Sequence, residues 1–279
     1  MARQGDPTNT SRIDLMLRPH WQAKCRWIFK RARRLEIHCR HLKRLLPSLT
    51  KMNLSSISQA EHRYFTVAAV CVTVTVLAGF IPLYTLRLLH HDPNLTLLVH
   101  VHGLVMTAWI ALFLTQTLLI ARHHVAWHRR LGVFGAGLAM PVLLVGVPTL
   151  VHSAARRSHN IHSAEFLWML VAFDGLALVV FGCLTSLAML LRQSGDYHKR
   201  LMLLATISLL GPAFGRLTAY AKGLRSDSDI GVLLLCAGTV LACGIVDTVR
   251  SHRLHPTFAW GGASVIVMNV ATYLAKIMI

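Results

Sequence analysis

The chain has 279 residues, of which 54% are hydrophobic and only 14% are charged. A soluble domain normally carries about 25% charged residues, so this composition excludes a soluble globular protein. The formal net charge of +18 comes without any aromatic and basic reading module, which argues against a nucleic-acid partner.

The first 60 residues form a basic leader with 13 Lys and Arg against 3 Asp and Glu, and they contain no apolar stretch of spanning length. Three interpretations fit. The leader is an amphipathic helix on an anionic membrane surface, a mitochondrial-type targeting segment, or an over-extended start with Met52 as the alternative first residue. We favour the over-extended start, and we expect residues 61–279 to form the membrane domain.

Seven apolar segments of roughly 20 residues follow the leader, and this length crosses a hydrocarbon core of about 30 Å. They cover about residues 64–86, 95–121, 130–153, 166–191, 199–220, 230–249 and 257–278, and Gly211-Pro212 interrupts the fifth. Short connections make neighbouring helices antiparallel. Beyond the leader, the connections on the side of the amino terminus contain nine Lys and Arg against six on the other side. The prediction is an all-α polytopic transmembrane bundle with a cytoplasmic amino terminus.

A short basic motif recurs where helices are expected to begin. His128-Arg129-Arg130-Leu131 opens the third span, and His198-Lys199-Arg200-Leu201 opens the fifth, 70 positions later. His252-Arg253-Leu254, followed by His255-Pro256, opens the seventh. Basic residues at a helix amino terminus are unfavourable unless an anion is supplied. Lipid phosphates, cofactor carboxylates or an acidic partner would supply it, and the alternative is that the positive-inside rule alone placed these bases.

Ionisable residues inside spans are costly and usually face the interior of a bundle. Four such residues lie in the predicted spans, namely His102, Asp174, Arg216 and Asp247. Their depths in the membrane predict two polar clusters. The outer cluster would contain His102, Asp174 and either Arg216 or His152. The inner cluster would contain Asp247, His128, His198, His255 and nearby arginines. The simpler alternative is that these groups only hydrogen-bond or pair between helices.

Histidines at two depths are typical of the axial ligands of b-type haem. An outer haem would use His102 with His152, and an inner haem would use His128 with His198. The residues expected to meet the haem carboxylates are Arg129, Arg130, Lys199 and Arg200. One objection is that di-haem membrane cytochromes usually carry two ligands about 14 residues, or four turns, apart on one helix, and no span here has such a pair.

Sequence motifs of hydrolases, nucleotide-binding proteins and metal sites are absent. The sequence contains no GxSxG, Walker, HExxH or CxxC motif, so a hydrolytic enzyme is not expected. The six cysteines form no disulfide framework. A small-solute or proton transporter is the second hypothesis, with Asp174 and Asp247 titrating and His102 as a relay. A purely structural membrane protein is the third.

Several segments resemble a family of uncharacterised bacterial inner-membrane proteins over roughly residues 62–279. They are LLVHVHGLVMTAW, WHRRLGVFG, HKRLMLLATISLLGPAFGRL and DTVRSHRLHPTFAWG. The resemblance implies a multi-pass fold in the bacterial inner membrane and brings no established activity. More distantly, the His-Arg-Leu helix starts are similar to b-type cytochromes and cytochrome-oxidase assembly proteins. The leading hypothesis is therefore a haem-binding or respiratory-assembly module. Its expected partners are the bilayer with its anionic headgroups, a respiratory complex or a second copy of the chain.

Overall fold

The computed structural model describes residues 49–93, 95–158, 164–221 and 229–278, with side chains described for residues 59–93, 95–155, 173–221 and 230–274. The chain divides into two units, Met1–Ser58 and Gln59–Ile279. Up to residue 48, the predicted basic leader lies outside the described residues. The arrangement that follows is that of the second unit.

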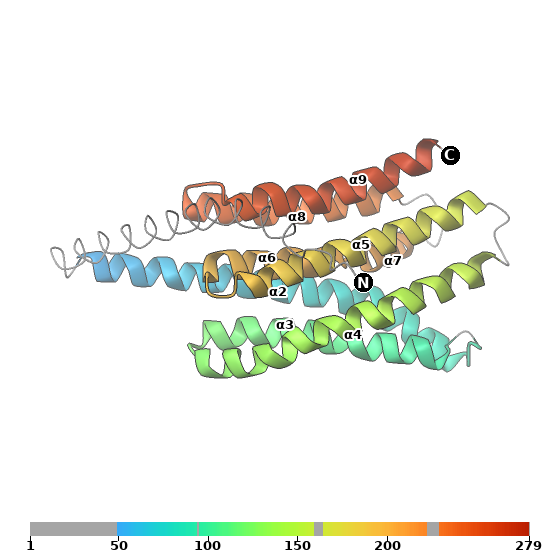
Figure 1. The fold of residues 1–279 in the computed structure, drawn as a ribbon, viewed down its shortest axis with the longest axis horizontal. Helices are drawn as coiled ribbons and strands as arrows, with labels where there is room; N and C mark the ends of the chain where they lie inside the picture. The colour runs from blue at the N-terminus through green and yellow to red at the C-terminus, as the bar shows by residue number, and fades with distance from the viewer. Residues whose placement is uncertain (1–48, 94, 159–163, 222–228, 279) are drawn as a thin grey trace, which may run out of the picture. The chain divides into compact units, whose positions relative to one another are not determined.

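Every regular element among the described residues is a helix, as predicted (Figure 1). The elements are α2 (Leu49–Leu89), α3 (Leu97–Ala121), α4 (Val125–Ser158), α5 (Ala164–Leu190), α6 (Gly195–Ser208), α7 (Gly211–Ala221), α8 (Asp229–Ser251), the π-helical turn η1 (Phe258–Gly262) and α9 (Ala263–Met278).

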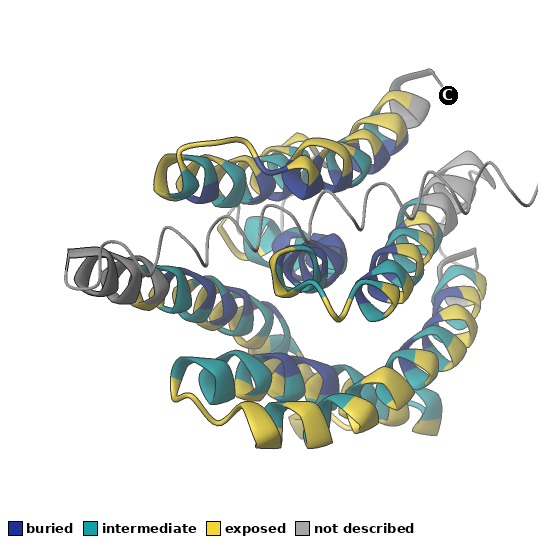
Figure 2. Ribbon diagram, turned by 60° about the vertical axis from the view of Figure 1, so that its left-hand side comes forward, coloured by how far each residue is buried: buried dark blue, intermediate teal, exposed yellow. Residues whose placement is uncertain are grey.

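The helices have the length and surface of a multi-pass membrane protein. Within the described part of the chain, five helices are long and apolar enough to cross a bilayer, and α6 with α7 make a sixth if this bent pair is one span. The last apolar helix, Phe258–Leu274, is shorter. Large apolar side chains such as Leu77, Phe134 and Leu144 are exposed. Figure 2 shows exposed positions along the outward-facing sides of the helices. Soluble monomers rarely expose such continuous apolar surface, whereas lipid tails accept it.

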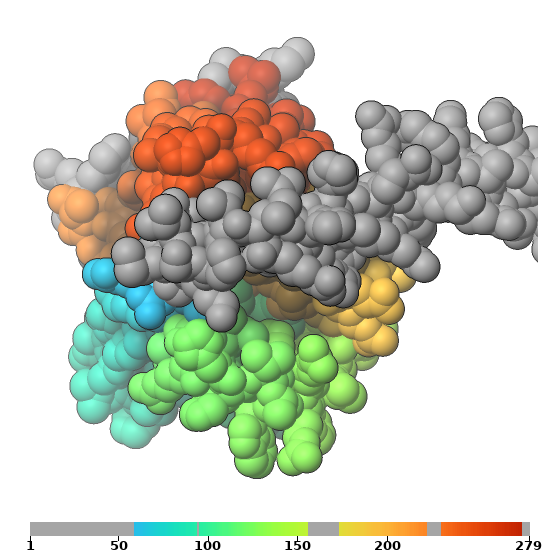
Figure 3. Space-filling view, turned by 90° about the vertical axis from the view of Figure 1, so that its left-hand side faces the viewer, coloured from blue at the N-terminus to red at the C-terminus, as the bar shows by residue number. Residues whose placement is uncertain are grey.

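Three helical hairpins place their turns at one end of the bundle (Figure 1). Helix α3 packs on α4, α5 on α6, and α8 on α9. We call the end formed by residues 122–124, 191–194 and 252–255 the turn end. Figure 3 looks onto it, with α4 in green, the α5–α6 turn in yellow and the α8–α9 turn in orange. The antiparallel order predicted from the short connections is therefore confirmed for these three hairpins.

Histidines end two of these helices in the left-handed conformation. His123 has φ 61° and His252 has φ 53°. After α3, the N–H of His124 donates to the carbonyl of Leu119 at 2.8 Å, which closes the last turn. Glycine usually occupies such a position because it has no Cβ, although histidine is among the residues enriched there.

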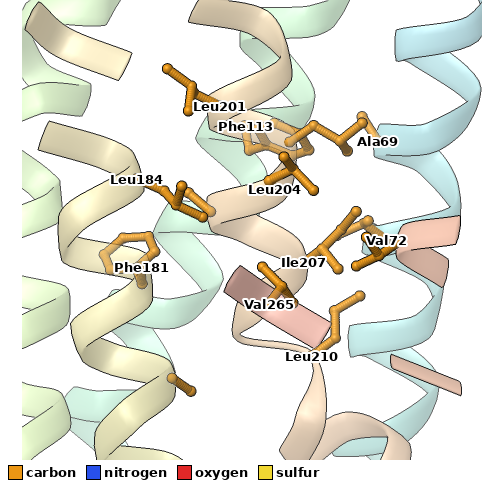
Figure 4. Close-up of a cluster of buried hydrophobic side chains, with 14 of the residues drawn as sticks. Ala69, Val72, Phe113, Phe181, Leu184, Leu201, Leu204, Ile207, Leu210 and Val265 are labelled. Carbon is orange, nitrogen blue, oxygen red and sulfur yellow. The ribbon is translucent and has the colours of Figure 1, made fainter. Parts of the chain in front are cut away.

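Helix α6 is the centre of the core, and eight of its residues are buried. Figure 4 shows Leu201, Leu204 and Ile207, spaced three residues apart on α6, among side chains from other helices. Phe181 of α5 and Val72 of α2 belong to the same buried cluster. A helix covered on all sides needs apolar residues all round, and this explains why α6 lacks a single polar stripe below its first turn.

The predicted interruption near Gly211-Pro212 is present as a 47° bend between α6 and α7. The helix stops after Ser208, and Gly211 and Pro212 are the first two residues of α7. Proline is tolerated there because the first turn of a helix has unpaired N–H groups in any case. The bend is tightly packed, since a Cβ on Gly211 would lie 2.5 Å from the Phe173 ring.

Candidate functional site

The two full copies of the basic motif occupy equivalent places in two hairpins. Helix α4 begins at Val125 and α6 begins at Gly195, so His128 and His198 are each the fourth residue of their helix. Each hairpin has its turn at the turn end. The third copy differs, because residues 252–254 precede the helix that begins at Pro256. This helix starts one residue before the start predicted for the seventh span, so the third copy directly precedes that segment as predicted but lies outside its first turn.

His128 and His198 lie next to each other. Their ring centroids are 6.4 Å apart and the ring planes are nearly perpendicular, at 83°. Nδ1 of His198 lies 2.9 Å from the carbonyl oxygen of Ala188 in α5. A carbonyl only accepts hydrogen bonds, so this nitrogen carries the proton and Nε2 of His198 keeps its lone pair. The ring is therefore fixed by a backbone group and has one nitrogen able to bind a metal.

Gln116 of α3 supports the other histidine. With the amide turned so that both ends find partners, its nitrogen donates to the carbonyl oxygen of His128 at 3.1 Å and also to Nδ1 of the same residue. Its oxygen accepts from the N–H of Gly132 at 2.9 Å. These two backbone groups are four residues apart in the continuous helix α4. Gln116 thus bridges them from the side and fixes the site of His128.

Arg200 faces a different neighbour from His198. Residues two apart on a helix point about 200° apart, so the two side chains leave α6 on opposite faces. Arg200 is buried and makes a two-pronged ion pair with buried Asp247 of α8, through Nε–Oδ2 and Nη2–Oδ1 contacts of 2.9 Å each. Lys199 pairs with Glu61 of α2 and, at 2.7 Å, with Asp196. These two bases, predicted to meet haem carboxylates, are thus engaged by carboxylates of the chain itself.

His255 lies near this ion-pair network, against Tyr197 at a ring-centroid distance of 4.9 Å, and directly precedes a helix. Its Nδ1 accepts the N–H of Thr257 at 3.2 Å, and its carbonyl accepts the N–H of Phe258 at 2.9 Å. Pro256 follows at the first helical position, where its missing N–H is harmless. Burial, and then the positive charge of Arg200, lower the pKa of His255. The structure therefore divides the predicted inner cluster, with Asp247 and His255 on one side of α6 and the histidine pair on the other.

The remaining basic residues of the first motif face outward. Arg129 and Arg130 are exposed at the turn end. The guanidinium of Arg130 lies 5.6 Å from the ring centroid of Trp127, which is itself 62% exposed. A tryptophan beside arginines at the end of an apolar helix is typical of the membrane–water interface.

The opposite end of the bundle brings together part of the predicted outer cluster. Arg216 of α7 stacks 4.1 Å from the ring centroid of Phe80, and it lies close enough for its charge to act on His102. Asp174 is partly buried and has interactions of its own. His152 has a buried Nε2 without a hydrogen-bond partner in the described part of the chain. No ring contact or hydrogen bond joins His102 to His152 among the described residues.

Sequence reasoning missed several residues that position these groups. Gln116 was missed because only ionisable side chains were weighed, although an amide inside an apolar span was a usable signal. Tyr64 was missed too, and its hydroxyl donates to the carbonyl of Cys243 at 2.8 Å. A second histidine pair, His62 with His123, has ring centroids 5.7 Å apart. His62 lies in α2 and His123 in the turn after α3, and nothing in the sequence pairs them.

Comparison with protein-family models, with curated proteins and with solved structures finds no match for this chain. The function is therefore argued from the geometry of the site.

Proposed function

We propose that this chain is a redox module of the bacterial inner membrane that binds b-type haem through His128 and His198. The observation that carries the proposal is the spacing of the two rings. Two imidazoles on one metal ion, each nitrogen about 2.0–2.1 Å from it, place their ring centroids between roughly 5 and 6.3 Å apart, depending on the angle between the two bonds. The two rings here are 6.4 Å apart.

The surroundings of the pair favour a metal over a purely structural contact. The Nδ1–H of His198 donates to the backbone carbonyl of Ala188. A metal-binding histidine usually makes such a hydrogen bond with the ring nitrogen that does not bind the metal. Arg129 and Arg130 directly follow His128 in the sequence and are exposed, so they would be the residues that meet the haem carboxylates. A haem iron held by two imidazoles would supply one-electron transfer. Such chemistry suits a component, or an assembly factor, of a respiratory complex.

We also propose seven spans with the amino terminus in the cytoplasm. The shorter helix Phe258–Leu274 would be the seventh span. The excess of Lys and Arg on the side of the turn end supports this orientation, and anionic headgroups would be the partners of Arg129 and Arg130. A fluorescent protein fused after Ile279 would then lie outside and stay dark. Bright fluorescence would contradict this topology.

The haem proposal is tested by absorption spectra of the purified full chain, expressed with added haem precursor. We expect a Soret band and a sharp α band after dithionite reduction. His128→Ala and His198→Ala should each abolish both bands while the protein stays helical and monodisperse. The control is His123→Asn, which changes the other histidine pair with a residue that tolerates φ 61°. A flat spectrum from folded wild type would refute haem binding.

One observation favours a second candidate, a proton or small-solute transporter. Broken helices are typical of transporter binding sites, and α6 and α7 are bent by 47°. Arg216 lies on α7, just after this bend, and near His102 of α3, and Asp174 on α5 would be the titrating group. Proteoliposomes with an internal pH dye would report proton flux. Loss of flux in Asp174→Asn, with the fold intact, would support transport, and unchanged flux would remove Asp174 from it.

A further inference from the structure

The hydrogen bonds around the histidine pair fix which nitrogen of each ring carries a proton. His198 donates from Nδ1 to a carbonyl, so its Nε2 is unprotonated. His128 accepts at Nδ1 from the Gln116 amide nitrogen, so a neutral His128 carries its proton on Nε2. The two rings are thus held as opposite tautomers.

Only one of these tautomers is ready to bind a metal through Nε2. His198 presents a lone pair, whereas His128 presents an N–H, which cannot ligate. For both rings to bind one iron through Nε2, His128 must release the Nε2 proton and take one up at Nδ1. This exchange leaves the number of bound protons unchanged. An Nδ1–H then needs an acceptor, and the nearest polar side chain is the amide of Gln116.

We infer that Gln116 is the positioning residue that sets the tautomer of His128, and with it the access of iron to the site. In one amide orientation its nitrogen faces Nδ1 of His128, and the proton of a neutral His128 stays on Nε2. In the other, its oxygen accepts from Nδ1–H and Nε2 of His128 becomes free. The second orientation gives up the bonds to the His128 carbonyl and the Gly132 N–H. The part of this inference that concerns iron rests on the proposed haem function, whereas the tautomer does not.

The role of Gln116 can be separated from simple packing, because its amide nitrogen only donates hydrogen bonds and its amide oxygen only accepts them. A carboxylate at this position can only accept, so Gln116→Glu should hold His128 as the Nδ1–H tautomer. Gln116→Leu keeps similar bulk without any hydrogen bond. A structural role alone predicts that both variants lose stability and that neither shifts the tautomer in a defined direction.

The first experiment measures the tautomers directly in haem-free full chain labelled with ¹⁵N-histidine. We expect an Nε2–H signal for His128, assigned by its loss in His128→Ala, and an Nδ1–H signal for His198. Gln116→Glu should convert the His128 signal to Nδ1–H and leave that of His198 unchanged. An Nδ1–H signal for His128 in wild type, or no change in Gln116→Glu, would overturn the inference whether or not haem binds.

The second experiment titrates the same variants with hemin. Gln116→Glu should bind at least tenfold more tightly than wild type and give a lower midpoint potential, because a carboxylate makes its histidine a stronger donor to iron. Gln116→Asn has a shorter side chain whose amide does not reach the ring. It should show neither the tighter hemin binding nor the lower midpoint potential. Equal affinity and potential in wild type and Gln116→Glu would refute the role in iron access. Absence of hemin binding in every form would refute the proposed function instead.

Discussion

The buried ion pair between Arg200 and Asp247 offers the sharpest test of how the bundle is held together. Both side chains are about 4% exposed, and two contacts of 2.9 Å join them. Asp247→Asn keeps the shape and removes the charge, which leaves a buried guanidinium without its main partner. Removing one member of a buried pair typically costs about 3–5 kcal/mol.

The structure narrows this magnitude. Arg200 would still face the carboxylates of Asp196 at 3.6 Å and Glu61 at 3.9 Å. These more exposed groups offset part of the loss, so we expect a loss near the lower end, about 3 kcal/mol. For a chain of this size, each kcal/mol lowers the melting temperature by about 2–4 °C, which gives roughly 6–12 °C.

The assay is reversible unfolding in mixed detergent micelles together with thermal melting, and the matched control is Asp196→Asn. Asp196 also contacts Arg200 but is 61% exposed, so its loss should cost less than about 1 kcal/mol. The double variant Arg200→Met with Asp247→Leu should recover most of the stability, because an apolar pair leaves no buried charge. A loss in Asp247→Asn no larger than in Asp196→Asn, or a double variant as unstable as the single one, would refute the reasoning.

Three further outcomes are expected from other parts of the bundle. Because burial lowers the pKa of His255 in the folded state, its contribution to stability is complete above about pH 6.5 and is lost as the pH falls through the folded pKa. Melting temperatures between pH 7.5 and 5 should therefore fall more for wild type than for His255→Asn, and equal slopes would contradict this. Gly79→Ala would place a Cβ 2.9 Å from the carbonyl oxygen of Ala213 and should cost about 1–3 kcal/mol in micelle unfolding. Gly103→Ala, which meets nothing within 4 Å, should be neutral or stabilise by up to about 1 kcal/mol, and a similar loss in both variants would argue against the close approach. Tyr64→Phe loses the 2.8 Å bond to a carbonyl of α8 and should cost about 0.5–1.5 kcal/mol in the same assay, so an unchanged unfolding free energy would show that this bond contributes nothing.

Much of the architecture follows from the sequence because it depends on local properties. Apolar segments of spanning length predict helices, and short polar turns between them make neighbours antiparallel. Alternation then places the turns after α3, α5 and α8 at one end, and the structure has them there. The same argument predicted that His128 and His198 would lie at a common depth. Their ring contact is therefore partly a consequence of sequence spacing.

Tertiary packing decided which group each side chain meets. The sequence places His198 and Arg200 on opposite faces of α6, but only the packing of α5 and α8 shows that one meets the Ala188 carbonyl and the other Asp247. Gln116 reaches into α4 only because α3 packs against it. A helical period defines faces and depths from within one segment. Which neighbour covers a face depends on contacts between residues far apart in the chain, and a single sequence does not encode those in any local pattern.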